Sequence, residues 1–184
     1  MRFDEAVALI APAIGAPGGA WADLGAGAGT FTRALLHLLG PAGRVVAVER
    51  EASALASLRR LARDDARLLV EEADFTEPLD LHRLGTRLLD GALLANALHF
   101  VPAERQARVL AEVSRQISPG GRIAVVEYEG RRPSRWVPAP VSFDRFALLA
   151  HDAGLGAAMR VGTRDSAFGG EMYAAFAEVR GRAA

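Results

Sequence analysis

Short apolar runs alternate with longer amphipathic stretches along the chain of 184 residues. The short runs are rich in β-branched residues and leucine, which is typical of buried strands. The longer stretches repeat leucine every three or four positions, as one face of a helix does. We expect strands at residues 21–25, 44–49, 67–71, 88–95, 122–128, 157–163 and 172–179. We expect helices at residues 30–39, 51–63, 102–117 and 142–153, after a short helix near the N-terminus.

This alternation predicts an α/β fold in which helices cover both faces of a mostly parallel sheet, giving a three-layer sandwich. The Pro119-Gly120-Gly121 turn is expected to end the helix at 102–117 before the next strand begins. The last two strands are joined by the short, turn-like segment RDSAFGG, so they can pair antiparallel. Since a chain of this length usually folds around one core, residues 1–184 are expected to form a single domain.

The composition removes several kinds of chemistry. All 22 residues counted as Lys or Arg are arginine, and cysteine is absent. Without lysine the chain cannot form a Schiff base with pyridoxal phosphate, complete a Walker A loop or assemble the Tyr–Lys pair of a short-chain dehydrogenase. Without cysteine it has no disulfide, thiolate nucleophile or thiolate metal site, and no spacing of His, Asp and Glu suggests a metal.

Charge and hydropathy favour a protein that works in the cytoplasm. The formal net charge is zero at pH 7, which argues against a broad surface for nucleic acid. The apolar runs are much shorter than the roughly 20 residues that span a bilayer, so we expect no membrane association. The N-terminal stretch carries Asp4 and Glu5 and lacks the pattern of a signal peptide.

The most informative segment is the glycine-rich turn of residues 25–29 (GAGAG), which lies between the first expected strand and the following helix. Small residues let the backbone turn sharply and let a ligand approach the main chain, and the helix presents its first N–H groups to that ligand. Asp23 precedes the turn, and Glu49 ends the second strand, where a carboxylate can bind ribose hydroxyls. The pattern predicts a nucleoside-containing cofactor; the alternative is a tight turn that binds nothing.

The turn and the segments after it resemble the class I S-adenosylmethionine-dependent methyltransferases over most of the chain. The family's first motif, an acid followed by Gly-x-Gly-x-Gly, matches residues 23–29, and its ribose-binding acid matches Glu49. Its acid near the adenine matches Asp74, its residue at the methionine end of the cofactor matches Asn96, and its Pro-Gly-Gly turn matches residues 119–121. The resemblance implies a Rossmann-like sheet of seven strands whose last strand is antiparallel and inserted between the fifth and sixth.

With S-adenosyl-L-methionine as the cofactor, the resemblance assigns a role to each part of the site. Asp23 would favour the ammonium group, directly or through water, and the N–H groups of the glycine turn would meet the carboxylate. Asp74 or its neighbouring amides would bind the adenine edge, with Phe75 and Arg50 packing near the ring. Otherwise Asp74 is a helix or turn cap, Phe75 is a core residue and Asn96 is a turn residue at a strand end. The expected cofactor-binding residues are Asp23, Gly25, Ala26, Gly27, Gly29, Glu49, Arg50, Asp74, Phe75 and Asn96.

Three residues near the ends of the fourth and fifth expected strands are candidates for catalysis. His99 follows the fourth strand and can accept a proton there. Glu127 and Tyr128 end the fifth strand, at the edge where sheets of this kind bind ligands. Methyl transfer needs a base only when the nucleophile is a poor one, such as an aliphatic hydroxyl. The alternatives are a structural histidine and a solvated strand end.

The irregular segment after the fifth strand carries Arg131, Arg132, Arg135 and Trp136. These arginines would recognise an anionic group on the methyl acceptor, with Trp136 as an apolar wall, or they form a solvated loop. Little chain remains for a separate substrate domain. This favours a small, open acceptor site or one completed by another subunit. We expect a small-molecule acceptor and a protein that is a monomer or a homodimer.

We therefore expect a methyltransferase that acts on a small molecule by in-line displacement. One alternative acts on RNA or protein, which the arginine-rich loop favours and the zero net charge disfavours. A second alternative binds the cofactor without transferring a methyl group, because the motifs do not settle the catalytic residues. A nicotinamide oxidoreductase is a more distant alternative.

Overall fold

The computed structural model describes residues 1–79, 88–167 and 169–181, in which seven strands form one sheet. The strands are β1 (Ala20–Leu24), β2 (Arg44–Glu49), β3 (Leu68–Glu72), β4 (Leu89–Ala95), β5 (Ile117–Tyr128), β6 (Met159–Asp165) and β7 (Glu171–Glu178). The helices are α1 (Phe3–Ile14), α2 (Thr30–Leu39), α3 (Ala52–Asp64), α4 (Gln106–Ser114), α5 (Phe143–Asp152) and the short 3-10 helix η2 (Leu98–Phe100). These elements lie close to the predicted ones, apart from α4 and β5.

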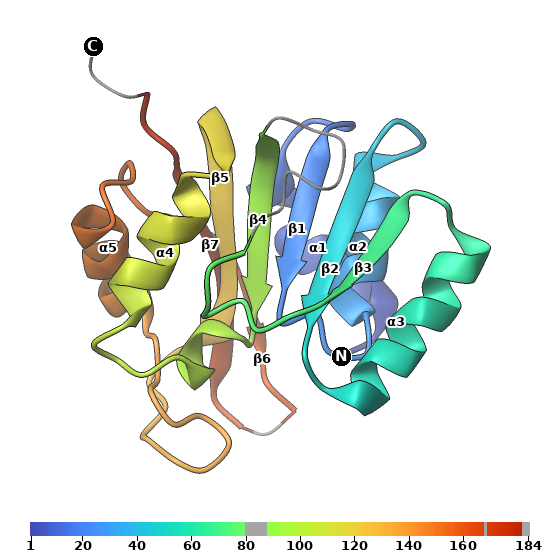
Figure 1. Ribbon diagram of the computed structural model, residues 1–184. Helices are drawn as coiled ribbons and strands as arrows, with labels where there is room; N and C mark the ends of the chain where they lie inside the picture. Colours follow the sequence, from blue (N-terminus) through green and yellow to red (C-terminus); the bar gives the residue numbers. More distant parts are fainter. Residues whose placement is uncertain (80–87, 168, 182–184) are drawn as a thin grey trace.

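The sheet has the strand order β3-β2-β1-β4-β5-β7-β6 (Figure 1). Strands β1 to β5 pair parallel, whereas β7 pairs antiparallel with both β5 and β6. The hairpin of β6 and β7 therefore inserts the last strand between β5 and β6. This topology confirms the predicted three-layer, Rossmann-like sheet of seven strands with an antiparallel last strand.

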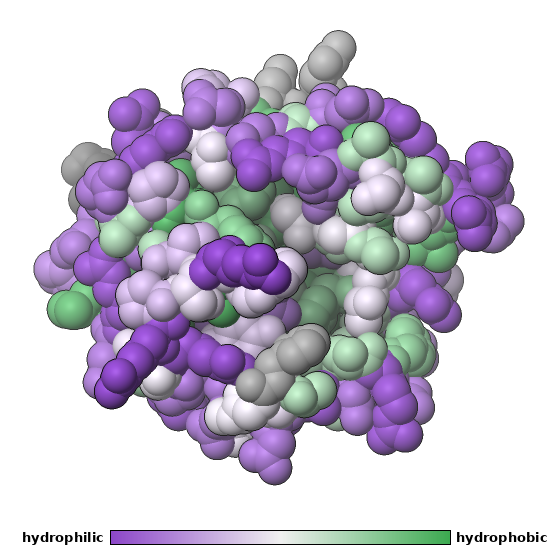
Figure 2. Space-filling view, turned by 90° about the horizontal axis from the view of Figure 1, so that it is seen from below, coloured by the Kyte–Doolittle hydropathy of each residue, from purple (hydrophilic) through white to green (hydrophobic). Residues whose placement is uncertain are grey.

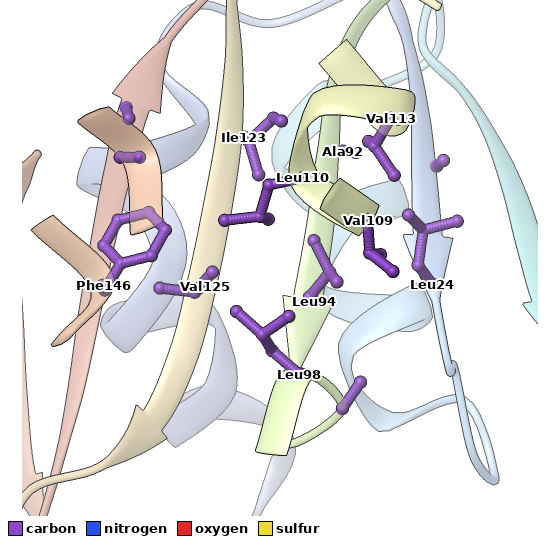
Figure 3. Close-up of a cluster of buried hydrophobic side chains, with 14 of the residues drawn as sticks. Leu24, Ala92, Leu94, Leu98, Val109, Leu110, Val113, Ile123, Val125 and Phe146 are labelled. Carbon is purple, nitrogen blue, oxygen red and sulfur yellow. The ribbon is translucent and has the colours of Figure 1, made fainter. Parts of the chain in front are cut away.

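Helices cover both faces of the sheet. Buried side chains of α1 and α2 form one apolar cluster with one face. Helices α4 and α5 pack on the other face, where Figure 3 shows Leu110 and Phe146 against Leu94 and Val125. Each of these side chains is almost fully buried, and burying one such side chain contributes about 1.5–3 kcal/mol to stability. No helix within the described ranges is long and apolar enough to cross a membrane.

The predicted helix at residues 102–117 is wrong at both ends, because α4 covers only Gln106–Ser114. Ile117 already pairs with Leu89 of β4, so β5 begins before the Pro-Gly-Gly turn that was expected to precede it. Gly120 has a φ of 83°, and the pairing with β4 shifts register nearby. Main-chain pairing with β4 thus outweighs the helical side-chain pattern, and the glycines let the strand bend without ending.

The carboxyl ends of β1, β2, β4 and β5 lie along one edge of the sheet, at the bottom of Figure 1. The chain leaves these strands through the glycine-rich turn, Arg50, Asn96 and the irregular segment of residues 129–141. Figure 2 looks onto this edge and shows a hollow with an apolar to neutral floor between hydrophilic side chains. The fold therefore gathers the predicted site segments at one place.

Candidate active site

The turn after β1 has a backbone that requires glycine. Gly25, Gly27 and Gly29 have φ of 72°, 54° and 90°, in the left-handed region that residues with a side chain disfavour. A Cβ on Gly25 would lie 2.8 Å from the Cβ of Ala97 and 3.2 Å from the ring of Phe75. The tight turn of residues 25–29 therefore connects β1 to α2. The first N–H groups of α2 have no acceptor within the helix itself.

Glu49, at the end of β2, holds the turn from the side. Its Oε2 accepts a hydrogen bond from the Gly27 N–H at 2.7 Å. Its Oε1 accepts from the N–H groups of Arg50 and Glu51 at 2.8 and 2.9 Å. Three main-chain donors thus fix this carboxylate. Oε1 accepts two of them, so Oε2, which accepts one, keeps lone-pair capacity for a further donor such as a ribose hydroxyl.

A cavity of about 520 Å³ lies between the glycine turn, the end of β2 and the segments after β3 and β4. It brings together most of the residues predicted to bind the cofactor. These are Gly25, Ala26, Gly27, Glu49, Arg50, Asp74, Phe75 and Asn96. The N-terminus of α2 also lines the cavity, so the positive end of the helix dipole is available to an anionic group of a ligand.

Asp23 and Gly29 lie behind the wall of this cavity. The Asp23 carboxylate is 1% exposed and accepts a hydrogen bond from Thr32 Oγ1 at 2.6 Å, which ties β1 to the first turn of α2. Burial raises the pKa of Asp23 to about 7, the Thr32 hydroxyl opposes this rise, and the nearby charge of Glu49 adds to it. Gly29 supports the turn in another way, because a Cβ there would come within 3.0 Å of Leu58.

An ion pair lies at the end of the cavity near β3. Arg50 Nη1 donates to Asp74 Oδ2 at 2.7 Å, and Asp74 Oδ1 accepts from the N–H and the hydroxyl of Thr76. Partial burial acts to raise the pKa of Asp74, but the hydrogen bonds from Thr76 and Arg50 hold it below its ordinary value. Asp74 is therefore an ionised turn cap that also faces the cavity, with Phe75 packed beside it against Gly25.

Asn96 has an unusual backbone and an unsatisfied side chain. Its φ of 54° is the only positive value at a non-glycine residue within the described ranges. Asparagine tolerates this conformation better than most residues, but strained backbone conformations of this kind cluster at active sites and ligand-binding sites. Its Oδ1 is buried and accepts no hydrogen bond from the described part of the chain. This oxygen is suited to accept a hydrogen bond from a ligand.

A second cavity, of about 420 Å³, adjoins the first. It is formed by η2, the end of β5 and the irregular segment of residues 129–141. Its lining includes His99, Tyr128, Arg131 and other residues that follow β4 and β5. The two cavities share Asn96 and Phe100, which therefore stand at their junction.

His99 and Glu127 form a buried pair beside the second cavity. His99 Nδ1 lies 2.6 Å from Glu127 Oε2, and the main-chain N–H of His99 donates to Oε1 of the same carboxylate at 3.2 Å. The two side chains are 2% and 0% exposed. Burial raises the pKa of Glu127, while the hydrogen bonds from His99 act against this rise. We assign the proton to Nδ1, because a carboxylate requires a donor; Nε2 is then a hydrogen-bond acceptor.

The remaining predicted residues divide between the cavity and its rim. The ring of Tyr128 lies 6.0 Å from that of His99, and burial raises the pKa of the Tyr128 hydroxyl. Arg131 lines the cavity with its guanidinium 4.9 Å from the centre of the Tyr128 ring. Arg135 instead stacks on Trp136 at 4.4 Å, and Arg132 lies on the loop outside the cavity lining. Of the three arginines predicted to lie at the mouth of the substrate site, Arg131 lines the second cavity, whereas Arg132 and Arg135 do not.

Sequence reasoning did not include Phe100, Ser134 and Val137 in the site. Phe100 directly follows His99, and a large apolar side chain just after the end of a strand was the available signal. Ser134 and Val137 lie in a segment without periodicity, where no pattern indicates which side chains face inward. Sequence reasoning also treated His99 and Glu127 as separate candidates, whereas the fold pairs them.

Comparison with known proteins agrees with this geometry. Residues 22–121, more than half of the chain, match the family described as methyltransferase domain. The fold is similar to that of 1,6-didemethyltoxoflavin-N1-methyltransferase of Burkholderia thailandensis, whose structure contains 1,6-didemethyltoxoflavin and S-adenosylhomocysteine. The TM-score is 0.74 and the sequence identity is 22%, and the match covers 97% of this chain and 78% of that chain. It is also similar to CalO1, a methyltransferase in calicheamicin biosynthesis, with a TM-score of 0.74, 24% identity, and 97% and 54% coverage.

A curated relative is similar over a shorter stretch. Ribosomal RNA small subunit methyltransferase H of Chromobacterium violaceum is 37% identical over 79 residues. The match covers 42% of this chain and 25% of that enzyme, so the chain matches about a quarter of the relative's length.

Proposed function

The chain belongs to the methyltransferase domain family, whose class I members use S-adenosylmethionine, and from this premise we propose that it methylates a small molecule. The observation that carries the proposal is the junction of the two cavities at Asn96 and Phe100. In-line displacement needs a methyl donor and an acceptor in adjoining sites. The volume of the second cavity lies within the roughly 300–1,000 Å³ of small-ligand sites.

The residues of the first cavity suit the cofactor. Oε2 of Glu49 would accept a hydrogen bond from a ribose hydroxyl, and Asp74 and Phe75 would bind the adenine. The buried Oδ1 of Asn96 is suited to the ammonium group at the methionine end. When bound, S-adenosylmethionine supplies an already activated methyl group, so the protein needs only to bind, orient and exclude water.

Asp23 supports this site indirectly. Because its carboxylate bonds to Thr32 and lies behind the cavity wall, it positions the start of α2 and with it the N–H groups that face the cofactor carboxylate. A direct contact with the ammonium would require the Thr32 hydrogen bond to be exchanged. We therefore assign to Asp23 a positioning role, with any effect on the ammonium passing through water.

Two measurements test the proposal. Isothermal titration calorimetry of the purified protein with S-adenosylhomocysteine should give saturable binding, and no binding at millimolar concentration would overturn the assignment. Incubation with methyl-labelled S-adenosylmethionine and a panel of small hydroxyl, amine and thiol compounds should transfer the label to at least one of them. A protein that binds the cofactor product and labels nothing in the panel would instead fit a cofactor-binding module.

A second candidate acceptor is RNA, which the partial similarity to a ribosomal RNA methyltransferase favours. The zero net charge of the chain counts against it, because binding to a phosphate backbone depends on a surplus of cationic side chains. RNA binding that weakens steeply with salt, together with label transfer to RNA and none to the small molecules, would replace the small-molecule proposal.

A further inference from the structure

We propose that the acceptor is a planar aromatic compound carrying a hydroxyl group, and that Nε2 of His99 takes the proton from this hydroxyl. The inference rests on the proposed function and deepens it, because it names the substrate class of the same site. It is drawn from the buried pair of His99 and Glu127 and from the aromatic side chains of the second cavity.

The pair gives His99 a defined direction for proton transfer. With the proton on Nδ1 and bonded to Glu127, Nε2 presents a lone pair, and it makes no hydrogen bond within residues 1–79, 88–167 and 169–181. Glu127 is fully buried and lies against the histidine ring, so a second proton on the ring completes a close ion pair. The positive charge that His99 gains with a proton at Nε2 is therefore paired with the buried carboxylate of Glu127.

Such a base is useful to a hydroxyl and of little use to a neutral amine, which attacks with a lone pair it already has. In the step, the acceptor oxygen bonds to the methyl carbon, and the carbon–sulfur bond breaks with its electron pair kept by sulfur. The hydroxyl proton passes to Nε2 of His99. The products are a methyl ether, a neutral thioether and an imidazolium paired with Glu127, and the imidazolium then releases its proton to water.

The cavity walls favour a planar ring on the acceptor. Phe100, Tyr128 and Trp136 line it from three different elements. The rings of His99 and Phe100 lie 4.4 Å apart. Phe100 and Trp136 are 55% and 69% exposed, and exposed apolar side chains around a cavity mark a surface that a ligand covers. Rings stacked on such side chains gain stability beyond that from the burial of their area.

The charged and titratable groups around the pair agree with an oxygen acceptor. Tyr173 lies opposite Glu127 on β7 and donates its hydroxyl to a main-chain oxygen, and burial raises its pKa. Burial also raises the pKa of Tyr128, so both phenols remain neutral. Arg131 is the cation in the wall of this cavity among the described residues. Its positive charge favours an acceptor oxygen that becomes negative as its proton leaves.

The test uses 4-nitrophenol, whose phenolate absorbs visible light and whose phenol does not. The full-length protein, saturated with S-adenosylhomocysteine, is titrated with this probe at a pH where the free probe is mostly protonated. We expect binding that increases the phenolate band above that of the free probe, because the proton moves to His99. The His99→Gln variant should lose most of this increase.

The matched control is His151→Gln, which removes an exposed histidine of α5 and should behave as the wild type. Thermal unfolding and S-adenosylhomocysteine titration establish that His99→Gln is folded and binds the cofactor product. An equal phenolate band in wild type and His99→Gln would overturn the inference, as would the absence of probe binding at millimolar concentration. Failure of the wild type to bind S-adenosylhomocysteine would overturn the proposed function instead.

The labelled acceptor panel gives an independent readout. Methyl ethers among the products support the inference, and His99→Gln should lower kcat/KM for those acceptors about a hundredfold or more, the usual range for loss of a general base. Transfer to amines or thiols only would overturn the inference and leave the proposed function standing. For Glu127, a positioning residue, we expect Glu127→Gln to reduce the phenolate band while S-adenosylhomocysteine binding is retained.

Discussion

The two adjoining cavities are built in different ways. The first is shaped mainly by the backbone: left-handed glycines, the N-terminus of α2, and a carboxylate held by three main-chain N–H groups. The second is shaped by side chains, namely His99, Tyr128 and Trp136, one of which stands on an irregular loop. The backbone-built side can be recognised from the spacing of a few residues. The shape of the second cavity depends on which aromatic side chains of the loop face inward. These side chains can differ among proteins of the same fold.

The largest effect that we expect concerns the first cavity, where Asp23 makes the free energy of unfolding depend on pH. The pKa of Asp23 is about 7 against an ordinary 3.8, chiefly because of burial. Between these two values the unfolded chain releases the proton and the folded chain keeps it. The folded protein therefore loses stability as the pH rises from about 4 to about 7, by on the order of 4 kcal/mol, and the loss is constant above that range.

The Asp23→Asn variant should lack this loss while retaining the hydrogen bond from Thr32. Urea unfolding at a series of pH values measures the difference between the two proteins, which should widen up to about pH 7 and then stay constant. Asp152→Asn, at an exposed carboxylate of α5, is the control and should keep the wild-type dependence. Parallel curves for wild type and Asp23→Asn would show that Asp23 titrates normally in the folded protein.

The next effect is steric and concerns the glycine turn. We expect Gly25→Ala to weaken S-adenosylhomocysteine binding by about 3 kcal/mol, roughly a hundredfold in Kd, because the new Cβ meets Ala97 and Phe75 and displaces the cavity wall. Calorimetric titration measures the loss. Gly154→Ala imposes a similar left-handed strain at φ 78° with nothing within 4 Å, so it should cost stability without loss of affinity. Equal affinities of the two variants would contradict a steric role for Gly25.

A smaller effect is expected from the charge of Glu49. Glu49→Gln keeps the shape of the side chain but removes its charge and turns one accepting oxygen into an NH2 group, which leaves at least one main-chain N–H without its acceptor. The affinity for S-adenosylhomocysteine should therefore fall by about 2 kcal/mol, roughly thirtyfold. Glu72→Gln is the matched variant at the end of the adjacent strand, where the carboxylate is exposed and pairs with Arg59. It should bind like the wild type. If Glu49→Gln does the same, the ribose hydroxyls are held elsewhere.

The smallest effect belongs to the side-chain-built cavity. We expect Trp136→Ala to raise KM for an aromatic acceptor, or Kd for 4-nitrophenol, by about 1 kcal/mol, roughly fivefold, through loss of one stacking wall. S-adenosylhomocysteine affinity should stay within twofold. Leu148→Ala removes another exposed apolar side chain, on α5, and serves as the control. A change in cofactor affinity without a change for the acceptor would reverse the roles assigned to the two cavities.

Most of the fold could be predicted from side-chain periodicity, because buried strands and amphipathic helices leave different patterns. The error at α4 and β5 arose where both patterns were possible. Ile117 continues the apolar stripe of the helix, yet its backbone pairs with Leu89. Side-chain spacing cannot report such pairing, since the partner strand lies far away in sequence.

The candidate site was predictable to a different extent on its two sides. Glu49 and Gly27 could be identified from spacing because a strand end and a turn fix where both lie. The pairing of His99 with Glu127 could not, because it depends on β4 and β5 being neighbours in register, with Ala95 opposite Val126. The left-handed backbone of Asn96 also has no signature beyond the residue type itself.

The insertion of β7 between β5 and β6 has a consequence for the order in which a ribosome completes the molecule. Glu127 of β5 pairs across the ladder with Tyr173 of β7, which emerges only after β6 and the turn that follows it. Every strand and helix around the glycine turn has by then been synthesised. A nascent chain can therefore assemble the half that holds the nucleoside first. The proposed proton-accepting pair is enclosed only when the last strand joins the sheet, so its enclosure depends on the part of the chain that is synthesised last.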